Sequence, residues 1–236
     1  MTDKDKRLAH KIYLYLGALF ITSLVVGNLI FQKFIYWQPF GDISVLGAPL
    51  FEVSVGILPY PITFLITDLI SEIFGKKKAN QIVTAGIFAS FFSMGIILLG
   101  DLAPAIANSP VDDAIFSKVF ALSPIAVLAS MIAYLLAQYV DIAVYHFWKR
   151  LTKGKHLWLR NNGSTFLSQF IDTFTVVLLL CTFKVLPWSL FYGLVVSGFI
   201  FKIFIAFLDT PFLYLCVYII RKRFHLEIGE EIDLEA

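Results

Sequence analysis

Long apolar runs, separated by short polar or charged stretches, divide most of the chain. A membrane-spanning helix needs about 20 largely apolar residues. Six runs meet this requirement and predict an all-α membrane protein, a bundle of six transmembrane helices. Together they form a single integral membrane domain, 1–236, with helices at about 12–32, 54–74, 79–99, 121–147, 165–186 and 188–220.

Prolines make two of these boundaries hard to place. The stretch 37–61 contains four prolines, so the second helix could begin several residues either side of 54. The sixth run is longer than one straight span, and Pro211 within it removes a backbone hydrogen bond, which favours a kink. The stretch 100–118 has the composition of a solvated loop, and 160–165 predicts a loop that ends in a Ser/Thr helix cap.

Composition supports a membrane protein with no separate soluble domain. The chain is 58% hydrophobic and 15% charged, whereas soluble domains are about 45–50% apolar and about 25% charged. Its mean hydropathy is +0.80. The first apolar run is long enough to span and lacks a clear small-residue cleavage site, so we do not expect a cleaved signal peptide. The two cysteines lie in apolar runs and predict no disulfide framework.

Lys and Arg residues alternate from one inter-helix segment to the next. If the N-terminus is cytoplasmic, the cytoplasmic segments hold 15 of these residues and the outer loops hold 2. This bias follows the positive-inside rule and predicts that both termini are cytoplasmic. Because topology explains the basic clusters, no nucleic-acid partner is expected; lipid or partner binding is the alternative.

Ionisable residues interrupt the apolar runs at a few positions. A charged group at the bilayer centre costs about 2.5–3.5 kcal/mol on insertion scales. Such residues are therefore expected to face the inside of the bundle, where they can hold a polar solute. Five acidic residues lie within the predicted helices: Asp68, Glu72, Asp141, Asp172 and Asp209.

Asp68 and Glu72 are four residues apart and share one helix face. Their Cβ atoms should lie about 5–6 Å apart. Two carboxylates this close repel in a low dielectric, which makes the pair a candidate proton site or a docking point for a donor-rich substrate. The alternative is an interfacial pair that neutralises the lysines at 76–78.

A glutamine followed three residues later by an aspartate occurs in two consecutive helices. The pairs are Gln138 with Asp141, and Gln169 with Asp172. Each pair offers an amide donor and acceptor beside a carboxylate acceptor on one helix face. The pairs therefore predict a shared polar lumen, and mutual helix–helix hydrogen bonding is the alternative. Asn28 in the first helix fits either role.

Aromatic residues make up 16% of the chain. Tyr139, Phe170 and Phe174 neighbour the two polar pairs in sequence, and stacking faces beside edge-on acceptors would suit a planar substrate. In the sixth helix Lys202 and Asp209 are seven residues apart on one face, so they could neutralise each other or pair elsewhere.

Chemistry beyond binding has no support in the motifs. The sequence has no ATP-binding loop, dinucleotide-binding glycine pattern or metal-spaced Cys/His cluster. It also lacks a recognisable His–carboxylate or Ser/Lys catalytic spacing. We therefore predict no cofactor, no metal and no enzymatic activity, although an intramembrane enzyme stays an alternative. Energy from ATP would require another chain, and the oligomeric state stays open.

Several motifs resemble the queuosine-precursor transporter family, also called the vitamin uptake transporter family. The similarity covers nearly the whole chain, including its length and six helices. It is carried by Thr67-Asp68, Ser71-Glu72 and Gly75-Lys76-Lys77, by Trp158-Leu159-Arg160-Asn161, Ser164-Thr165, Ser168-Gln169 and Asp172-Thr173, and by Asn28 and Lys33.

The resemblance implies an importer in the bacterial inner membrane for 7-cyano- and 7-aminomethyl-7-deazaguanine, the precursors of the tRNA nucleoside queuosine. It also implies a fold akin to the substrate-binding subunits of energy-coupling-factor transporters. A deazaguanine edge presents N–H donors that carboxylates and amides can accept. The partners expected are this small base and the lipid bilayer, and the predicted binding residues are Asn28, Asp68, Glu72, Gln138, Asp141, Gln169 and Asp172.

Two modes of transport fit this reading. The first is a stand-alone secondary transporter, with proton coupling through Asp68 and Glu72. The second is a binding subunit that depends on an ATP-driven module and takes up another purine or a vitamin. The substrate's name rests on the resemblance alone, because carboxylate–amide pairs also suit other small polar solutes.

Overall fold

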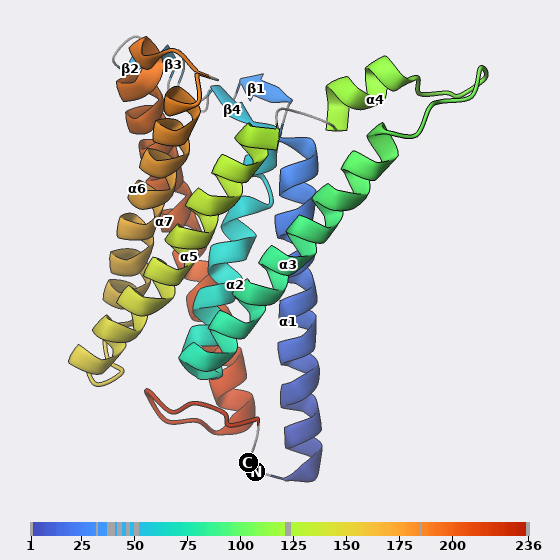
Figure 1. The fold of residues 1–236 in the computed structure, drawn as a ribbon. Helices are drawn as coiled ribbons and strands as arrows, with labels where there is room; N and C mark the ends of the chain where they lie inside the picture. The colour runs from blue at the N-terminus through green and yellow to red at the C-terminus, as the bar shows by residue number, and fades with distance from the viewer. Residues whose placement is uncertain are drawn as a thin grey trace.

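Six long helices form the body of the protein. The computed structural model describes residues 2–31, 33–36, 41, 44–45, 48–49, 52–120, 124–184 and 186–234. Within these residues, six helices are long and apolar enough to cross a membrane. They pack against one another as an elongated bundle (Figure 1), with the most extensive contacts between the fourth and fifth spans. The predicted all-α bundle of six spans is confirmed, and the protein is a multi-pass membrane protein.

Five of the spans are single α-helices that extend beyond the predicted ranges at one or both ends. The second consists of a 3₁₀ turn, η1 (Val55–Ile57), followed by α2 (Tyr60–Ile73). The described part of the fourth span begins at 124, because 121–123 lie outside the described residues. The single helices are α1 (Asp3–Ile30), α3 (Gly75–Asp101), α5 (Pro124–Leu151), α6 (Leu157–Thr182) and α7 (Phe191–Phe224).

The prediction began α1 nine residues too late, at 12. The Thr2 hydroxyl accepts a hydrogen bond from the Asp5 backbone N–H, and the Asp5 carboxylate accepts one from the Thr2 backbone in return. This capping box satisfies free N–H groups at the helix start. A charged segment that an apolar window excludes is therefore helical.

The predicted loop at 160–165 is wrong, because these residues lie inside α6. Asn161 and Asn162 donate hydrogen bonds to Thr210 of α7, at 3.4 and 3.2 Å. Polar residues with low helix propensity are kept helical here by hydrogen bonds between helices, which membrane bundles use widely.

Short helices and strands lie at the end of the bundle away from the termini, called the strand end below (Figure 1). The predicted loop at 100–118 contains part of a short helix, α4 (Asp113–Phe120), whose start is capped by the Asp112 carboxylate, 2.7 Å from the Ile115 N–H. A further 3₁₀ turn, η2 (Trp188–Leu190), precedes α7. Two antiparallel pairs join β1 (Phe34–Tyr36) to β4 (Glu52–Ser54) and β2 (Ser44–Val45) to β3 (Ala48–Pro49).

The opposite end, called the termini end below, gathers the basic segments. Both chain termini, the α2–α3 junction and the α5–α6 loop lie there (Figure 1). The segments whose Lys and Arg residues the sequence assigned to one membrane side are thus at one end of the bundle. This arrangement is what an even number of spans requires.

The C-terminal tail folds back against the end of α2. Ile232 donates its backbone N–H to the Ile73 carbonyl at 2.7 Å, and Lys149 donates to the carbonyls of Ser71 and Glu72 at 3.3 and 3.1 Å. The last carbonyls of a helix lack intrahelical partners. Lys149 and the tail satisfy these carbonyls and hold the end of α2 in place.

Gly75 makes the sharp turn from α2 into α3 possible. Its φ is +81°, and a Cβ added there would clash with the Glu231 carboxylate in the tail. We expect Gly75→Ala to lower stability by about 1–3 kcal/mol, since a left-handed conformation is strained for alanine. Gly95→Ala is the matched control, because a Cβ at Gly95 has no neighbour within 4 Å among the described residues. Thermal unfolding of both variants in detergent tests this, and equal losses would contradict it.

Candidate functional site

Polar side chains line the interior faces of α2, α5 and α6 at three successive levels. The first, the cavity layer, borders a cavity near the strand end; the second, the carboxyl layer, is deeper; the third, the ion cluster, lies at the termini end. The cavity layer is Tyr60, Thr63, Tyr134, Asp172 and Lys202; the carboxyl layer is Asp68, Gln138, Asp141, Ser168 and Gln169; the ion cluster is Glu72, Tyr145, Lys149, Arg160 and Arg221.

Helix geometry explains why the levels coincide. Tyr60 and Glu72 are 12 residues apart on α2, and so are Asp172 and Arg160 on α6, which runs in the opposite direction. At 1.5 Å per residue, both separations are about 18 Å. The polar residues on each helix therefore meet at matching depths.

The cavity has a volume of about 220 Å³. Drug-sized ligands occupy pockets of about 300–1,000 Å³, so this space suits a smaller solute. Its walls come from α1, η1, α2, α5, α6 and α7. Two of the predicted binding residues, Asn28 and Asp172, line it together with Tyr60, Tyr134 and Lys202.

Asp172 holds the centre of the cavity layer. The Tyr60 hydroxyl donates to Asp172 Oδ2 at 2.6 Å, and the Lys202 ammonium donates to the same oxygen. Lys202 Nζ also lies 4.6 Å from the centre of the Tyr60 ring, an attractive cation–π position. Of the two alternatives for Lys202, the structure shows pairing elsewhere, with Asp172 instead of Asp209.

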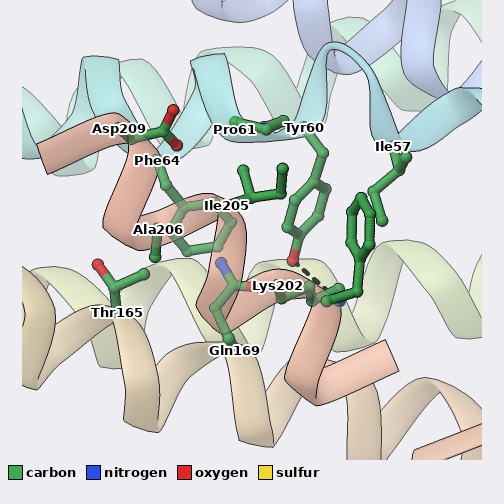
Figure 2. Close-up of a pocket in the computed structure, with 11 residues that line it drawn as sticks. Ile57, Tyr60, Pro61, Phe64, Thr165, Gln169, Lys202, Ile205, Ala206 and Asp209 are labelled. Atoms are coloured by element: carbon green, nitrogen blue, oxygen red, sulfur yellow. Dashed lines mark hydrogen bonds between the residues drawn. The ribbon is translucent and has the colours of Figure 1, made fainter. Parts of the chain in front are cut away.

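Asp209 borders a second, smaller cavity of about 20 Å³ (Figure 2). Thr165 and Gln169 of α6 line it from one side, and Pro61 and Phe64 of α2 from the other. Tyr60 and Lys202 border both cavities, so the two spaces are neighbours. The predicted residue Gln169 thus lies beside the main cavity without lining it.

The aromatic residues at the cavity differ from those the sequence suggested. Tyr139, Phe170 and Phe174 are 36%, 42% and 38% exposed on the outside of the bundle. Each lies one or two positions from an inward-facing polar residue. Because each step along a helix turns the side chain by about 100°, these aromatic side chains point in other directions. The interior ring cluster is instead Tyr60, Phe64 and Tyr134, with ring centroids 5.2–6.1 Å apart.

In the carboxyl layer, Asp68 of α2 and Asp141 of α5 lie close enough for their carboxyl groups to interact. Ser168 donates to Asp141 Oδ1 at 2.9 Å. Both carboxyl groups are almost completely buried. Two facing carboxylates repel in such a place unless a proton or a donor lies between them. Asp68 thus interacts with Asp141 on another helix as well as with Glu72, its predicted neighbour on the same helix face.

Buried acceptor oxygens without partners collect in the carboxyl layer. Native proteins pair nearly all buried polar groups, so unpartnered atoms point to ligand or water contacts. Four unpartnered acceptor oxygens in this layer belong to residues that the sequence analysis predicted to bind substrate. Among the residues that the structure describes, no partner is present for Asp68 Oδ1, Gln138 Oε1, Asp141 Oδ2 or Gln169 Oε1.

Glu72 has the opposite surroundings, because cations and a hydroxyl occupy both of its oxygens. Its Oε1 accepts from Arg160 Nη2 and Arg221 Nη2, each at 2.5 Å. Its Oε2 accepts from Arg160 Nε at 3.0 Å and from the Tyr145 hydroxyl at 2.8 Å, and Lys149 Nζ is 3.8 Å away. Glu72 joins α2 to α5, α6 and α7, and these contacts favour a closing role at the termini end over contact with substrate.

The structure adds cavity residues that the sequence reasoning missed. Tyr60 lay in the proline-rich stretch, where the start of the predicted helix was uncertain by several residues. Tyr134 carried a usable signal, since 134, 138, 141 and 145 are spaced by four, three and four residues and form one stripe on α5. Lys202 was noticed as a charged residue in an apolar helix, but its partner, 30 residues earlier, is brought close only by tertiary packing.

Taken together, six spans surrounding a buried polar core and a small cavity define a membrane carrier for a small polar solute. A family model described as "Putative vitamin uptake transporter" matches residues 54–216. The chain belongs to this vitamin uptake transporter family. The matched region contains every residue of the three layers except Arg221, and Asn28, which lines the cavity, also lies outside it.

One curated relative gives the family a more specific name. A protein of Bacillus subtilis (strain 168), named "Probable queuosine precursor transporter", is 26% identical over 162 residues. The match covers 68% of this chain and 70% of the relative. No solved structure matches the chain, so the likeness to energy-coupling-factor subunits stays a prediction.

From the contacts of the ion cluster we predict how much stability the protein loses when the charge of Glu72 is removed. Glu72→Gln leaves two arginines facing a neutral amide, and removing one partner from a buried ion pair costs about 3–5 kcal/mol. Glu231→Gln is the control, because its pair with Lys149 is 41% exposed on the glutamate side and such pairs contribute about 0–1 kcal/mol. Thermal unfolding in detergent should show a large loss for Glu72→Gln only. A small loss for Glu72→Gln would contradict the central place of this residue.

Proposed function

We propose that the protein imports the queuosine precursors 7-cyano- and 7-aminomethyl-7-deazaguanine across the bacterial inner membrane for queuosine salvage in tRNA. The observation that carries this proposal is the set of four unpartnered acceptor oxygens in the carboxyl layer. The guanine-like edge of a deazaguanine offers ring N–H and amino donors that match such acceptors. The name of the Bacillus subtilis relative supports the same substrate class.

The binding site proposed here combines the cavity and carboxyl layers. The base enters from the strand end, where Asn28 and Asp172 line the cavity and Tyr60 and Tyr134 offer ring faces. Asp68, Gln138, Asp141 and Gln169 accept its donors at the next level. Glu72, also predicted as a binding residue, contributes by closing the termini end.

The orientation in the membrane follows from charge. The termini end holds the 15 Lys and Arg residues assigned to cytoplasmic segments, although Lys149, Arg160 and Arg221 are used in the ion cluster. The remaining 12 still outnumber the 2 on the opposite side, so the bias persists. In this orientation the cavity lies toward the outside, where an importer first meets its substrate.

We favour a secondary transporter coupled to protons. The Asp68–Asp141 contact is a better candidate coupling site than the predicted Asp68–Glu72 pair, because Glu72 is neutralised by two arginines. A proton between the two carboxyl groups would relieve their repulsion, and substrate donors would do the same. Substrate and proton binding would then be linked through one pair of residues.

The second candidate is the binding subunit of an ATP-driven energy-coupling-factor transporter. In this candidate the chain would supply the six spans and the binding site, and a separate chain would supply ATP hydrolysis, because the sequence has no ATP-binding loop. Purification from the native host distinguishes the two. Copurifying ATPase subunits would favour the binding subunit, and uptake by the chain alone in a heterologous host would favour the secondary transporter.

Uptake in cells tests the substrate and the site together. Bacteria that cannot make the precursors and lack a transporter of their own would express this chain, receive a nanomolar precursor and be scored for queuosine in tRNA. We expect restored modification, and loss of it in Asp172→Asn and Asp68→Asn at normal membrane abundance. Asp112→Asn is the control, since an exposed asparagine keeps the helix cap. Normal uptake in both site variants would overturn the assignment.

Proton coupling has its own test. If protons drive import, a proton ionophore should reduce the initial rate of precursor uptake in the same cells, and Asp141→Asn should make the residual rate insensitive to pH. Initial rates must be measured within seconds, because downstream enzymes trap the base. An unchanged initial rate with the ionophore would leave facilitated passage as the mode of transport.

A further inference from the structure

The cavity contains one positive and one negative charge, and the two are bound to each other. Of the described residues that line it, Asp172 and Lys202 alone carry charges at neutral pH. They form a direct ion pair, with side chains that are 7% and 12% exposed. The cavity wall is therefore electrically neutral overall, and its single carboxylate is already occupied.

Lys202 is held in this place by more than the carboxylate. Its ammonium lies 4.6 Å from the centre of the Tyr60 ring and 3.4 Å from the Tyr60 hydroxyl, which itself donates to Asp172. A buried lysine is costly unless its charge is compensated, and here a carboxylate and a ring face both compensate it. The three side chains, from α2, α6 and α7, form one connected group.

A cationic solute and a neutral solute meet this group differently. A cationic solute approaching Asp172 would face the Lys202 ammonium, and one of the two cations would lose its counter-ion in a low dielectric. A neutral solute with an acceptor could instead receive a hydrogen bond from the Lys202 ammonium without separating the pair. Rejection by a built-in like charge is a common source of specificity.

We propose that Lys202 is a specificity-determining residue that makes the cavity select neutral planar bases and disfavour bases that carry an ammonium group. The inference rests on the proposed function, and it ranks the two precursors. The 7-cyano base is neutral and ends in an acceptor nitrogen, whereas the 7-aminomethyl base is a cation at neutral pH. The 7-cyano base is therefore the preferred substrate.

Binding to the purified protein tests this ranking. Dissociation constants for both bases would be measured by calorimetry with the full chain in lipid nanodiscs. Wild-type protein should bind the 7-cyano base at least about tenfold more tightly, because unfavourable polar contacts discriminate strongly between similar ligands. Lys202→Met should lower this ratio to about one or invert it, since Asp172 then becomes the counter-ion of the ammonium.

Two variants separate specificity from a structural role. Lys202→Arg keeps the positive charge and should keep the preference for the neutral base. Lys33→Met removes an exposed lysine between α1 and β1 and should leave both dissociation constants unchanged. If the ion pair were merely structural, Lys202→Met would weaken the binding of both bases equally, and the ratio of their dissociation constants would not change. If Lys202→Met yields too little folded protein, Lys202→Gln gives the same comparison with a neutral donor.

The outcomes distinguish this inference from the proposed function. Equal wild-type affinities, or an unchanged ratio in the lysine variants, would overturn the role of Lys202 while leaving precursor import intact. Failure of the wild-type protein to bind either base would overturn the proposed function, and the role of Lys202 with it. A preference for the 7-cyano base that disappears in Lys202→Met and persists in Lys202→Arg would establish the proposal.

Discussion

The interior of this protein is organised by one constraint: a polar group within the hydrocarbon must find its partner inside the protein. Glu72 is the most demanding case, because a carboxylate with no solvent exposure needs full compensation. Two arginines and a tyrosine supply it. Arg160 also donates hydrogen bonds from Nη1 to the carbonyls of Gly154 and Lys155 in the α5–α6 loop. One buried charge thereby fixes the relative positions of four helices and a loop.

The ion cluster and the carboxyl layer differ in whether the oxygens of their carboxylates have partners. In the ion cluster, both oxygens of the carboxylate have partners. In the carboxyl layer, one level deeper, acceptors on four side chains lack partners among the described residues. Glu72, Asp68 and Asp141 are all buried, so burial alone cannot account for the difference between their carboxylates. A site that receives and releases a solute needs unmet acceptors, whereas a helix junction needs none.

How far the sequence could predict this protein depends on whether the partner of each residue was local. The six spans and the shared stripe of Gln138 and Asp141 follow from periodicity within single helices. Contacts between helices do not follow from it: the pairing of Asp172 with Lys202 and of Glu72 with Arg221 depends on packing across 30 and 149 residues. The helix at 157–165 was missed for the same reason, since Asn161 and Asn162 gain their partner Thr210 only in the folded bundle.

The placement of the ion cluster at the end of the bundle also bears on how a carrier could open. Separating α2 from α6 and α7 would break the Glu72 pairs and release two arginine charges. At the centre of the bilayer this would cost several kcal/mol per ion, because nothing there replaces the lost partner. At an end that meets water, hydration replaces much of what is lost, and the closed and open arrangements can lie close in free energy. An ion cluster that water can reach when it opens can therefore serve as a closure. The more deeply buried carboxyl layer instead needs a proton or the substrate itself to compensate its charges.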